Sequence, residues 1–176
     1  NKLYVDPLGL RHKPYILNGL VNQLLNIQSV NIDLDATRLQ TGKIEGQFLK
    51  MLVQMTGAKR IIEVGMFTGY SALSMASGMP DDGELFTCEI SEEFRKFAQR
   101  YFDESPHGKK IKVLLGKASE SIAKLSGIFD LAFIDADKEG YLDYYQQILP
   151  KLRPGGIMAF DNALWSGAVL SPQNET

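Results

Sequence analysis

Acidic and amide side chains follow two apolar segments of the chain, at the points where each segment ends. Asp135 follows one such segment, and Asp161 and Asn162 follow another. If both segments are parallel strands, these side chains meet at the carboxyl edge of one sheet. Two carboxylates and an amide oxygen make a hard-oxygen site that suits Mg²⁺, Ca²⁺ or Mn²⁺. The alternative is that strand-end acids only cap the following helices, which holds for a lone Asp better than for three converging residues.

Lys138 lies three residues after Asp135 and is the candidate general base. A lysine next to a dication and in a desolvated pocket has a lowered pKa, which allows it to accept a proton. A solvated surface lysine is the alternative, and the sequence alone leaves both open.

The stretch from Arg60 to Ser71 reads as a buried strand, a tight turn between Gly65 and Gly69, and the start of a helix. Such a unit places backbone N–H groups beside the carboxyl end of the strand, where the adenosine half of a cofactor binds. A pyrophosphate-binding G-x-G-x-x-G pattern is not present. Taken alone, the turn is equally well explained by strand-to-helix packing.

Two further acids belong to the same region. Glu89 ends the second expected strand, a little over twenty residues after Gly65, where an acid accepts hydrogen bonds from a ribose diol. Its alternative role is to cap the helix that starts near Ser91. Glu63 lies inside the first strand, where an acid is costly to bury without a partner. We expect a backbone group or a ligand to satisfy Glu63, and otherwise it is an unexplained core acid.

Apolar runs and helical periodicities alternate along most of the chain. This alternation predicts a doubly wound parallel sheet with right-handed crossovers. The expected helices are one from Pro14 and those at 45–56, 69–79, 91–102, 118–125 and about 140–152; the expected strands are 60–64, 84–89, 111–115, 129–135 and 157–161, with a turn at 153–156.

Composition narrows the class of protein. A chain of 176 residues supports one α/β domain, and a net charge of −2 gives no indication of nucleic acid or an anionic membrane as a partner. No apolar run is long enough to span a bilayer, and the start of the chain is not a signal peptide. Cys88 is the single cysteine, which fits a reducing compartment, so we expect a cytoplasmic protein.

Three separated motifs carry a family resemblance. They are Gly65-Met-Phe-Thr-Gly-Tyr-Ser71, Asp135-Ala-Asp-Lys138 and Asp161-Asn-Ala-Leu-Trp165. Together they resemble the cation-dependent O-methyltransferases, S-adenosylmethionine enzymes related to the caffeoyl-CoA and catechol O-methyltransferases. The resemblance extends from about Glu45 to Trp165.

The resemblance implies a role for each matching position. Lys138 matches the candidate base, Asp135, Asp161 and Asn162 match the metal ligands, and Trp165 and residues 39–42 fall where the substrate is enclosed. The implied reaction transfers a methyl group from S-adenosylmethionine, leaving S-adenosylhomocysteine, to a catechol-like small molecule whose proton Lys138 removes. The implied cofactor-binding residues are Glu63, Gly65, Ser71, Glu89, Ala118, Asp135 and Asp137.

The family also implies a fold, a division of the chain and an assembly. The fold is a Rossmann-like class I methyltransferase fold with a mostly parallel sheet, here expected to lack the last two strands because the sequence ends soon after the fifth. Residues 1–40 form an N-terminal arm and helix for substrate or dimer contacts, and residues 41–176 form the S-adenosylmethionine-binding domain. Members of the family commonly form homodimers, so the resemblance implies a homodimer here.

Three other classes of protein compete with this interpretation. A NAD-dependent dehydrogenase is disfavoured by the absent third glycine and by the acids at Asp135 and Asp161. A nucleic-acid methyltransferase is disfavoured by the lack of basic charge and of a base-stacking Pro-Pro-Tyr type of segment after Asn162. A truncated, non-catalytic scaffold that binds S-adenosylmethionine, or nothing, is favoured only by the early end of the sequence.

Overall fold

The computed structural model describes residues 42–164. The expected arm and helix of residues 1–40, and Trp165, lie outside the described residues. The elements in chain order are α3 (Lys43–Thr56), β1 (Arg60–Val64), α4 (Tyr70–Gly78), β2 (Glu84–Glu89), α5 (Glu92–Glu104), η1 (Gly108–Lys110), β3 (Ile111–Leu115), α6 (Ala118–Lys124), β4 (Phe129–Ile134), η2 (Lys138–Gly140), α7 (Tyr141–Ile148), η3 (Leu149–Lys151) and β5 (Leu152–Phe160).

The described strands form one parallel sheet in the order β3-β2-β1-β4-β5. The chain moves outward from β1 to β3, then crosses over to β4 on the other side of β1. The carboxyl ends of β1 and β4 therefore border the switch point at which doubly wound folds bind ligands. The parallel, doubly wound sheet predicted from the sequence is confirmed.

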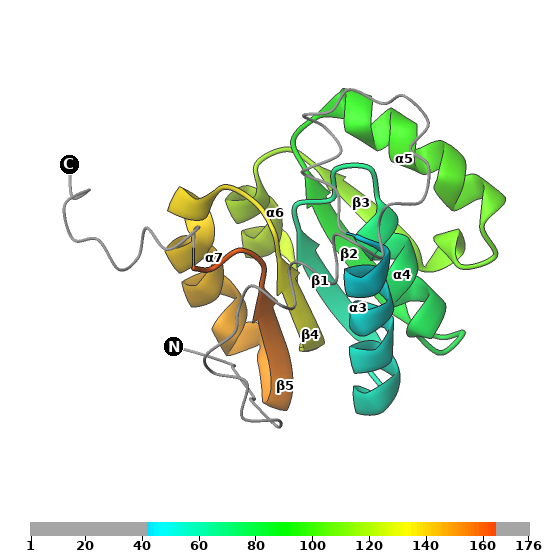
Figure 1. Ribbon diagram of the computed structural model, residues 1–176. Helices are drawn as coiled ribbons and strands as arrows, with labels where there is room; N and C mark the ends of the chain where they lie inside the picture. The colour runs from blue at the N-terminus through cyan, green and yellow to red at the C-terminus, as the bar shows by residue number, and fades with distance from the viewer. Residues whose placement is uncertain (1–41, 165–176) are drawn as a thin grey trace.

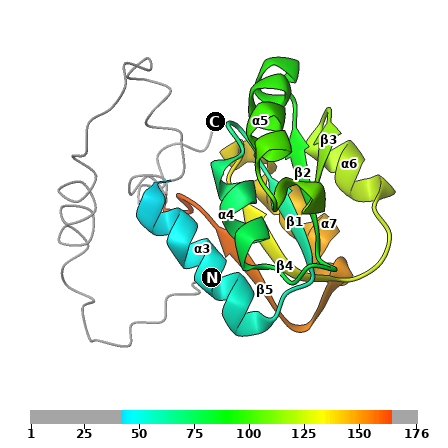
Figure 2. The same ribbon diagram turned by 90° about the vertical axis from the view of Figure 1, so that its right-hand side faces the viewer.

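Helices cover both faces of this sheet (Figures 1 and 2). On one face, α3, α4 and α5 pack on a core that includes Leu49, Met75 and Phe102. On the other, α6 and α7 pack on a core that includes Ile122 and Ile148. Neighbouring strand residues point into opposite cores, which explains why the strands read as continuous apolar runs rather than as alternating ones.

Local signals place the end of α3 and the start of α5 as expected. Gly57 ends α3 in the left-handed conformation at φ +61°, a conformation that a side chain would oppose. The Ser91 hydroxyl accepts a hydrogen bond from the N–H of Phe94 at the start of α5, and Glu92 and Glu93 complement the helix dipole there.

The approach to β5 differs from the sequence prediction. The helix ends at Ile148 rather than near 152, and β5 already begins at Leu152. Leu152 pairs with Phe129 and pairing resumes at Ile157, so the expected turn at 153–156 is a bulge within the edge strand. The Nε of Arg153 donates to Oδ1 of Asp130 at 2.8 Å, which holds this segment against β4.

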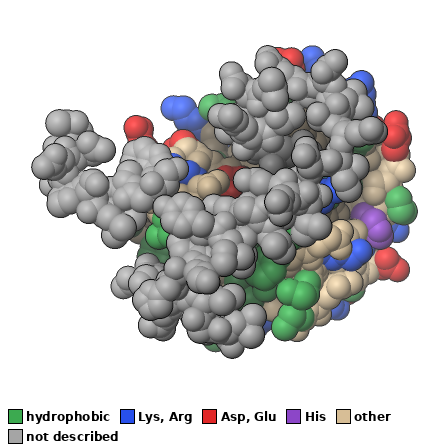
Figure 3. All heavy atoms as spheres, viewed as in Figure 1, with side chains coloured by type: hydrophobic (Ala, Val, Ile, Leu, Met, Phe, Trp, Pro, Cys, Tyr) green, Lys and Arg blue, Asp and Glu red, His purple; other side chains and the backbone are tan. Residues whose placement is uncertain are grey.

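The surface and helix lengths give two further observations. On the described part of the face in Figure 3, Lys and Arg side chains are interspersed with Asp and Glu. Among residues 42–164, no helix is both long enough and apolar enough to cross a bilayer.

Candidate cofactor and cation site

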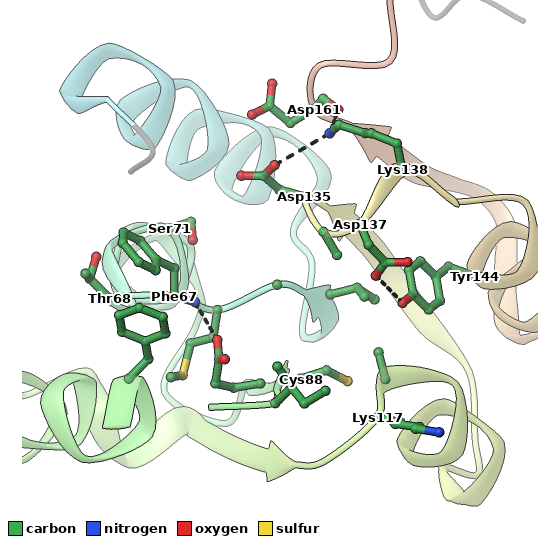
Figure 4. Close-up of a pocket in the computed structure, with 18 of the residues that line it drawn as sticks. Phe67, Thr68, Ser71, Cys88, Lys117, Asp135, Asp137, Lys138, Tyr144 and Asp161 are labelled. Atoms are coloured by element: carbon green, nitrogen blue, oxygen red, sulfur yellow. Dashed lines mark hydrogen bonds and ion pairs between the residues drawn. The ribbon is translucent and has the colours of Figure 1, made fainter. Parts of the chain in front are cut away.

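A cavity of about 1080 Å³ opens at the carboxyl ends of β1, β2, β4 and β5. Every residue that the sequence analysis assigned to cofactor, cation or catalysis lines it, except Glu63. These lining residues are Gly65, Ser71, Glu89, Ala118, Asp135, Asp137, Lys138, Asp161 and Asn162. The topology therefore brings together side chains that are almost a hundred residues apart in sequence (Figure 4).

The glycine turn forms one wall of the cavity. Gly65 has φ +98°, and a Cβ there would lie 1.9 Å from the backbone oxygen of Asp135. Glycine is therefore needed at this position for the ends of β1 and β4 to approach each other. The N–H groups of Gly65 and Met66 both donate to the carbonyl oxygen of Cys88, which ties the turn to β2.

Glu89 joins the glycine turn to the start of α5. Its Oε2 accepts from the N–H of Phe67 and its Oε1 from the N–H of Ser91, both at 2.8 Å. Glu89 therefore does bind the backbone at the start of α5, which was its alternative role. The same buried carboxylate also lines the cavity. Phe67 has φ +50°, a strained conformation for a bulky residue, and its ring packs edge-on against Phe94.

Glu63 lies beneath this wall, fully buried in β1. The Thr87 hydroxyl donates to its Oε2 at 2.5 Å, while its Oε1 has no hydrogen-bond partner among the described residues. Burial raises the pKa of Glu63 to about 7. The structure thus gives Glu63 a side-chain partner but no direct place on the cavity wall.

Asp135, Lys138 and Asp161 gather at the other end of the cavity (Figure 4). The Nζ of Lys138 lies 4.0 Å from Oδ1 of Asp135 and donates to the carbonyl oxygen of Asp161 at 3.1 Å. Burial and the nearby charge of Asp161 raise the pKa of Asp135 to about 6, although Lys138 opposes the shift. This end of the cavity, called the rim below, thus holds two carboxyl groups, those of Asp135 and Asp161, that repel each other.

Asn162 completes the strand-end set. It adopts φ +51°, a conformation that Asn tolerates better than most residues. Its backbone N–H and Nδ2 donate to the two carboxylate oxygens of Asp161, at 2.7 and 3.0 Å. Its amide nitrogen is thus turned toward Asp161, which leaves the amide oxygen as the atom with ligand capacity.

The donor set has the composition that a hard cation requires. Asp135, Asp161 and Asn162 offer oxygen ligands, which Mg²⁺, Ca²⁺ and Mn²⁺ prefer, and a cation there would relieve the repulsion between the two carboxylates. No group of three or more His, Cys, Asp and Glu side chains in residues 42–164 is arranged to hold a metal ion. The set therefore depends on the amide and on further ligands such as water.

Asp137 occupies a separate part of the cavity from Asp135. Its Oδ2 accepts from the N–H of Gly140 at 2.9 Å, and its Oδ1 accepts from the hydroxyl of Tyr144 at 2.7 Å. Asp137 therefore caps the turn that begins α7 while its carboxylate still borders the cavity. Ala118 starts α6 and lines the cavity as well.

Three residues near the site were not identified from the sequence. Glu45 on α3 lines the cavity, and burial together with the charges of Asp161 and Asp135 raises its pKa to about 7. Tyr144 and Tyr141 hydrogen-bond to Asp137 and Lys138, respectively. For the two tyrosines, the available signal was sequence spacing. Tyr144 lies seven residues after Asp137, and Tyr141 lies three residues after Lys138.

Fold and cavity together define the class: a Rossmann-like fold of the class I methyltransferase type. The O-methyltransferase TomG from Streptomyces achromogenes superposes with a TM-score of 0.78 at 25% identity, covering 90% of this chain and 78% of that one. A putative O-methyltransferase from Klebsiella pneumoniae gives 0.77 at 31% identity, with the same coverage.

Sequence comparison then gives the family. The O-methyltransferase family model matches residues 17–176, so the chain belongs to this family. Caffeoyl-CoA O-methyltransferase 2 from Zea mays is 38% identical over 142 residues, 77% of this chain and 54% of that protein. Tricin synthase 1 from Oryza sativa subsp. japonica is 38% identical over 143 residues, 76% of this chain and 57% of that protein. The chain spans a little over half the length of these curated relatives.

Proposed function

We propose that the protein is an S-adenosylmethionine-dependent and divalent-cation-dependent O-methyltransferase that acts on a vicinal dihydroxy aromatic small molecule. One observation carries the proposal. Asp135, Lys138, Asp161 and Asn162 converge at one end of a cavity whose other end is formed by the glycine turn and Glu89. A cofactor site and an oxygen-rich acceptor site are therefore contiguous, as methyl transfer between two bound molecules requires.

In this proposal, the glycine-turn end holds S-adenosylmethionine. Glu89 accepts hydrogen bonds from the ribose, and Gly65, Ser71, Ala118, Asp135 and Asp137 surround the rest of the cofactor, with Glu63 supporting the wall from beneath. The complexes of TomG with SAM and of a Bacillus cereus O-methyltransferase with SAH support this placement, because both share this fold.

The acceptor end binds a cation and the methyl acceptor. Asp135, Asp161 and Asn162 would hold the cation, which would supply Lewis acidity to the acceptor. A free phenol has a pKa of about 10, so its deprotonation near neutral pH needs assistance. Lys138, 4.0 Å from Asp135, would receive the proton, and the side chains at this end of the cavity would position the acceptor oxygen toward the cofactor end.

The test is methyl transfer from labelled S-adenosylmethionine to a panel of catechols, with Mg²⁺ or with a chelator. We expect transfer that requires the metal and falls at least about a hundredfold in Asp135→Asn, as for loss of a positioned charge at a reacting centre. The matched control is Asp143→Asn, an exposed acid of α7 that does not line the cavity.

Other outcomes separate the alternatives. Transfer that persists in chelator would rule out the cation. Cofactor binding seen by calorimetry without transfer to any catechol would rule out this acceptor class. Absence of both would favour the non-catalytic scaffold.

We extend the proposal to assembly, domain division and compartment. Four apolar side chains of α3 share one face of the helix and are exposed, namely Ile44, Phe48, Met51 and Met55. We propose that this apolar stripe of α3 supports a homodimer. We also propose that residues 1–40 make substrate and dimer contacts and that residues 41–176 form the cofactor-binding domain.

The buried free thiol of Cys88 supports a reducing, cytoplasmic location.

A further inference from the structure

Tyr141 lies at the start of α7, beside the cation end of the cavity but outside its wall. Its ring packs on Phe160 of β5, with 5.5 Å between ring centroids. The Nζ of Lys138 lies 4.4 Å from the centre of the Tyr141 ring, on the side of the hydroxyl. The side chain is therefore fixed between the last strand and the lysine.

The hydroxyl of Tyr141 connects three parts of the site. It accepts a hydrogen bond from the Nζ of Lys138 and donates to the carbonyl oxygen of Asp161 at 2.8 Å. The carbonyl oxygen of Ile134, at the end of β4, lies 3.3 Å away as a second acceptor. A tyrosine hydroxyl offers one donor and two acceptor positions, so these contacts use its donor and one acceptor.

We propose that Tyr141 is a positioning residue for Lys138, holding the lysine nitrogen at the rim formed by Asp135 and Asp161. The inference rests on the proposed function for its catalytic meaning. A lysine side chain is long and flexible, and its position is set by its partners. Within residues 42–164, the hydrogen-bond and ion-pair partners of Lys138 are the Tyr141 hydroxyl, the Asp161 carbonyl oxygen and the more distant Asp135 carboxylate. The hydroxyl also contacts the same Asp161 carbonyl, so it fixes the lysine relative to the end of β5.

Tyr145 provides a matched control on the same helix. Its ring also faces Phe160, at 6.5 Å between centroids, and the side chain is 41% exposed. Within residues 42–164, no hydrogen bond links Tyr145 to Lys138. Replacing either tyrosine by Phe removes one hydroxyl beside Phe160, and only Tyr141→Phe removes the contact with the lysine.

The first measurement needs no methyl transfer. The purified chain, without added metal, is treated with an acetylating reagent, and the modification rate of each lysine is followed by mass spectrometry. We expect Lys138 to react several-fold faster in Tyr141→Phe than in the wild type, because the nitrogen is no longer held, and at the wild-type rate in Tyr145→Phe. Lys151, which donates to the carbonyl oxygens of Ile122 and Leu125, is an internal reference.

The acetylation rates of Lys138 and Lys151 test whether Tyr141 positions Lys138. An unchanged Lys138 rate in Tyr141→Phe would overturn it. A rise at both Lys138 and Lys151 would also overturn it, because the tyrosine would then support the whole fold rather than the lysine.

The second measurement connects positioning to catalysis. In an active preparation we expect Tyr141→Phe to lower kcat about tenfold with little change in KM for either substrate, and Tyr145→Phe to change neither. A loss expressed only in KM would contradict the positioning role. If the wild type transfers no methyl group while the acetylation rates behave as expected, the proposed function fails and the placement of Lys138 by Tyr141 stands.

Discussion

The carboxyl group of Glu63 is buried in the middle of β1, and its pKa of about 7 lies well above the ordinary value of 4.5. A carboxyl group with a raised pKa holds its proton more tightly in the folded chain than in the unfolded one. Its contribution to stability is therefore complete below about pH 4.5 and is lost as the pH rises through about 7.

We expect Glu63→Gln to remove this pH dependence. The amide keeps an acceptor for the Thr87 hydroxyl and carries no charge. Between pH 5 and pH 8, the free energy of unfolding of the wild type should fall by roughly 3 kcal/mol more than that of the variant, at about 1.4 kcal/mol per pKa unit. Urea unfolding at the two pH values measures this, with Glu104→Gln as the exposed control. Equal slopes in wild type and variant would show that Glu63 is not responsible.

The candidate site shows which residues a sequence can reveal. Asp135, Asp161 and Asn162 were predicted to converge because parallel strands put their carboxyl ends at one edge, whatever the details of packing. Glu45 was not found because its place depends on how closely α3 packs on α4. That packing depends on Gly46, whose Cβ would lie 2.7 Å from side-chain atoms of Tyr70 and Ser74. Side-chain contacts across helices do not follow from periodicity alone.

At the scale of elements, α4 is held by a lysine from a distant part of the chain. The Nζ of Lys110 donates to the carbonyl oxygens of Ala76 and Met79 at the end of α4, and the Ala76 oxygen also accepts from the N–H of Met79. The lysine is only 4% exposed. Lys110→Met should therefore destabilise the fold by roughly 1–3 kcal/mol, the cost of leaving the buried carbonyl oxygen of Met79 unpaired.

Denaturant unfolding of Lys110→Met, compared with the neighbouring exposed Lys109→Met, measures this effect. A similar stability for the two variants would mean that water replaces the ammonium at the end of α4.

The elements also show where sequence prediction stops. Strand and helix order was predictable because the central strands β1, β2 and β4 are buried on both faces and the apolar runs alternate with helical periodicities. The boundary near Leu152 was not, because Arg153-Pro-Gly-Gly156 has the composition of a connecting turn. The ion pair of Arg153 with Asp130 and the pairing of Leu152 with Phe129 turn it into a bulge. Those contacts join residues more than twenty positions apart, which a local pattern does not record.

At the scale of the whole molecule, the exposed apolar stripe of α3 predicts self-association. Apolar side chains at Ile44, Phe48, Met51 and Met55 follow helical spacing on the side of α3 opposite to the buried Leu49 and Val53. Burying such a stripe between two copies removes it from water, and contiguous exposed apolar surface commonly marks an interface.

We expect the double substitution Phe48→Lys and Met51→Lys to shift the protein from dimer to monomer, because two charges on each facing helix repel and resist desolvation. Light scattering after size-exclusion chromatography measures the mass directly. Leu142→Lys is the control, because Leu142 is also exposed but lies on α7, on the opposite face of the sheet. A dimer that survives the α3 substitutions and dissociates in Leu142→Lys would move the interface to α7, and a monomeric wild type would remove the homodimer altogether.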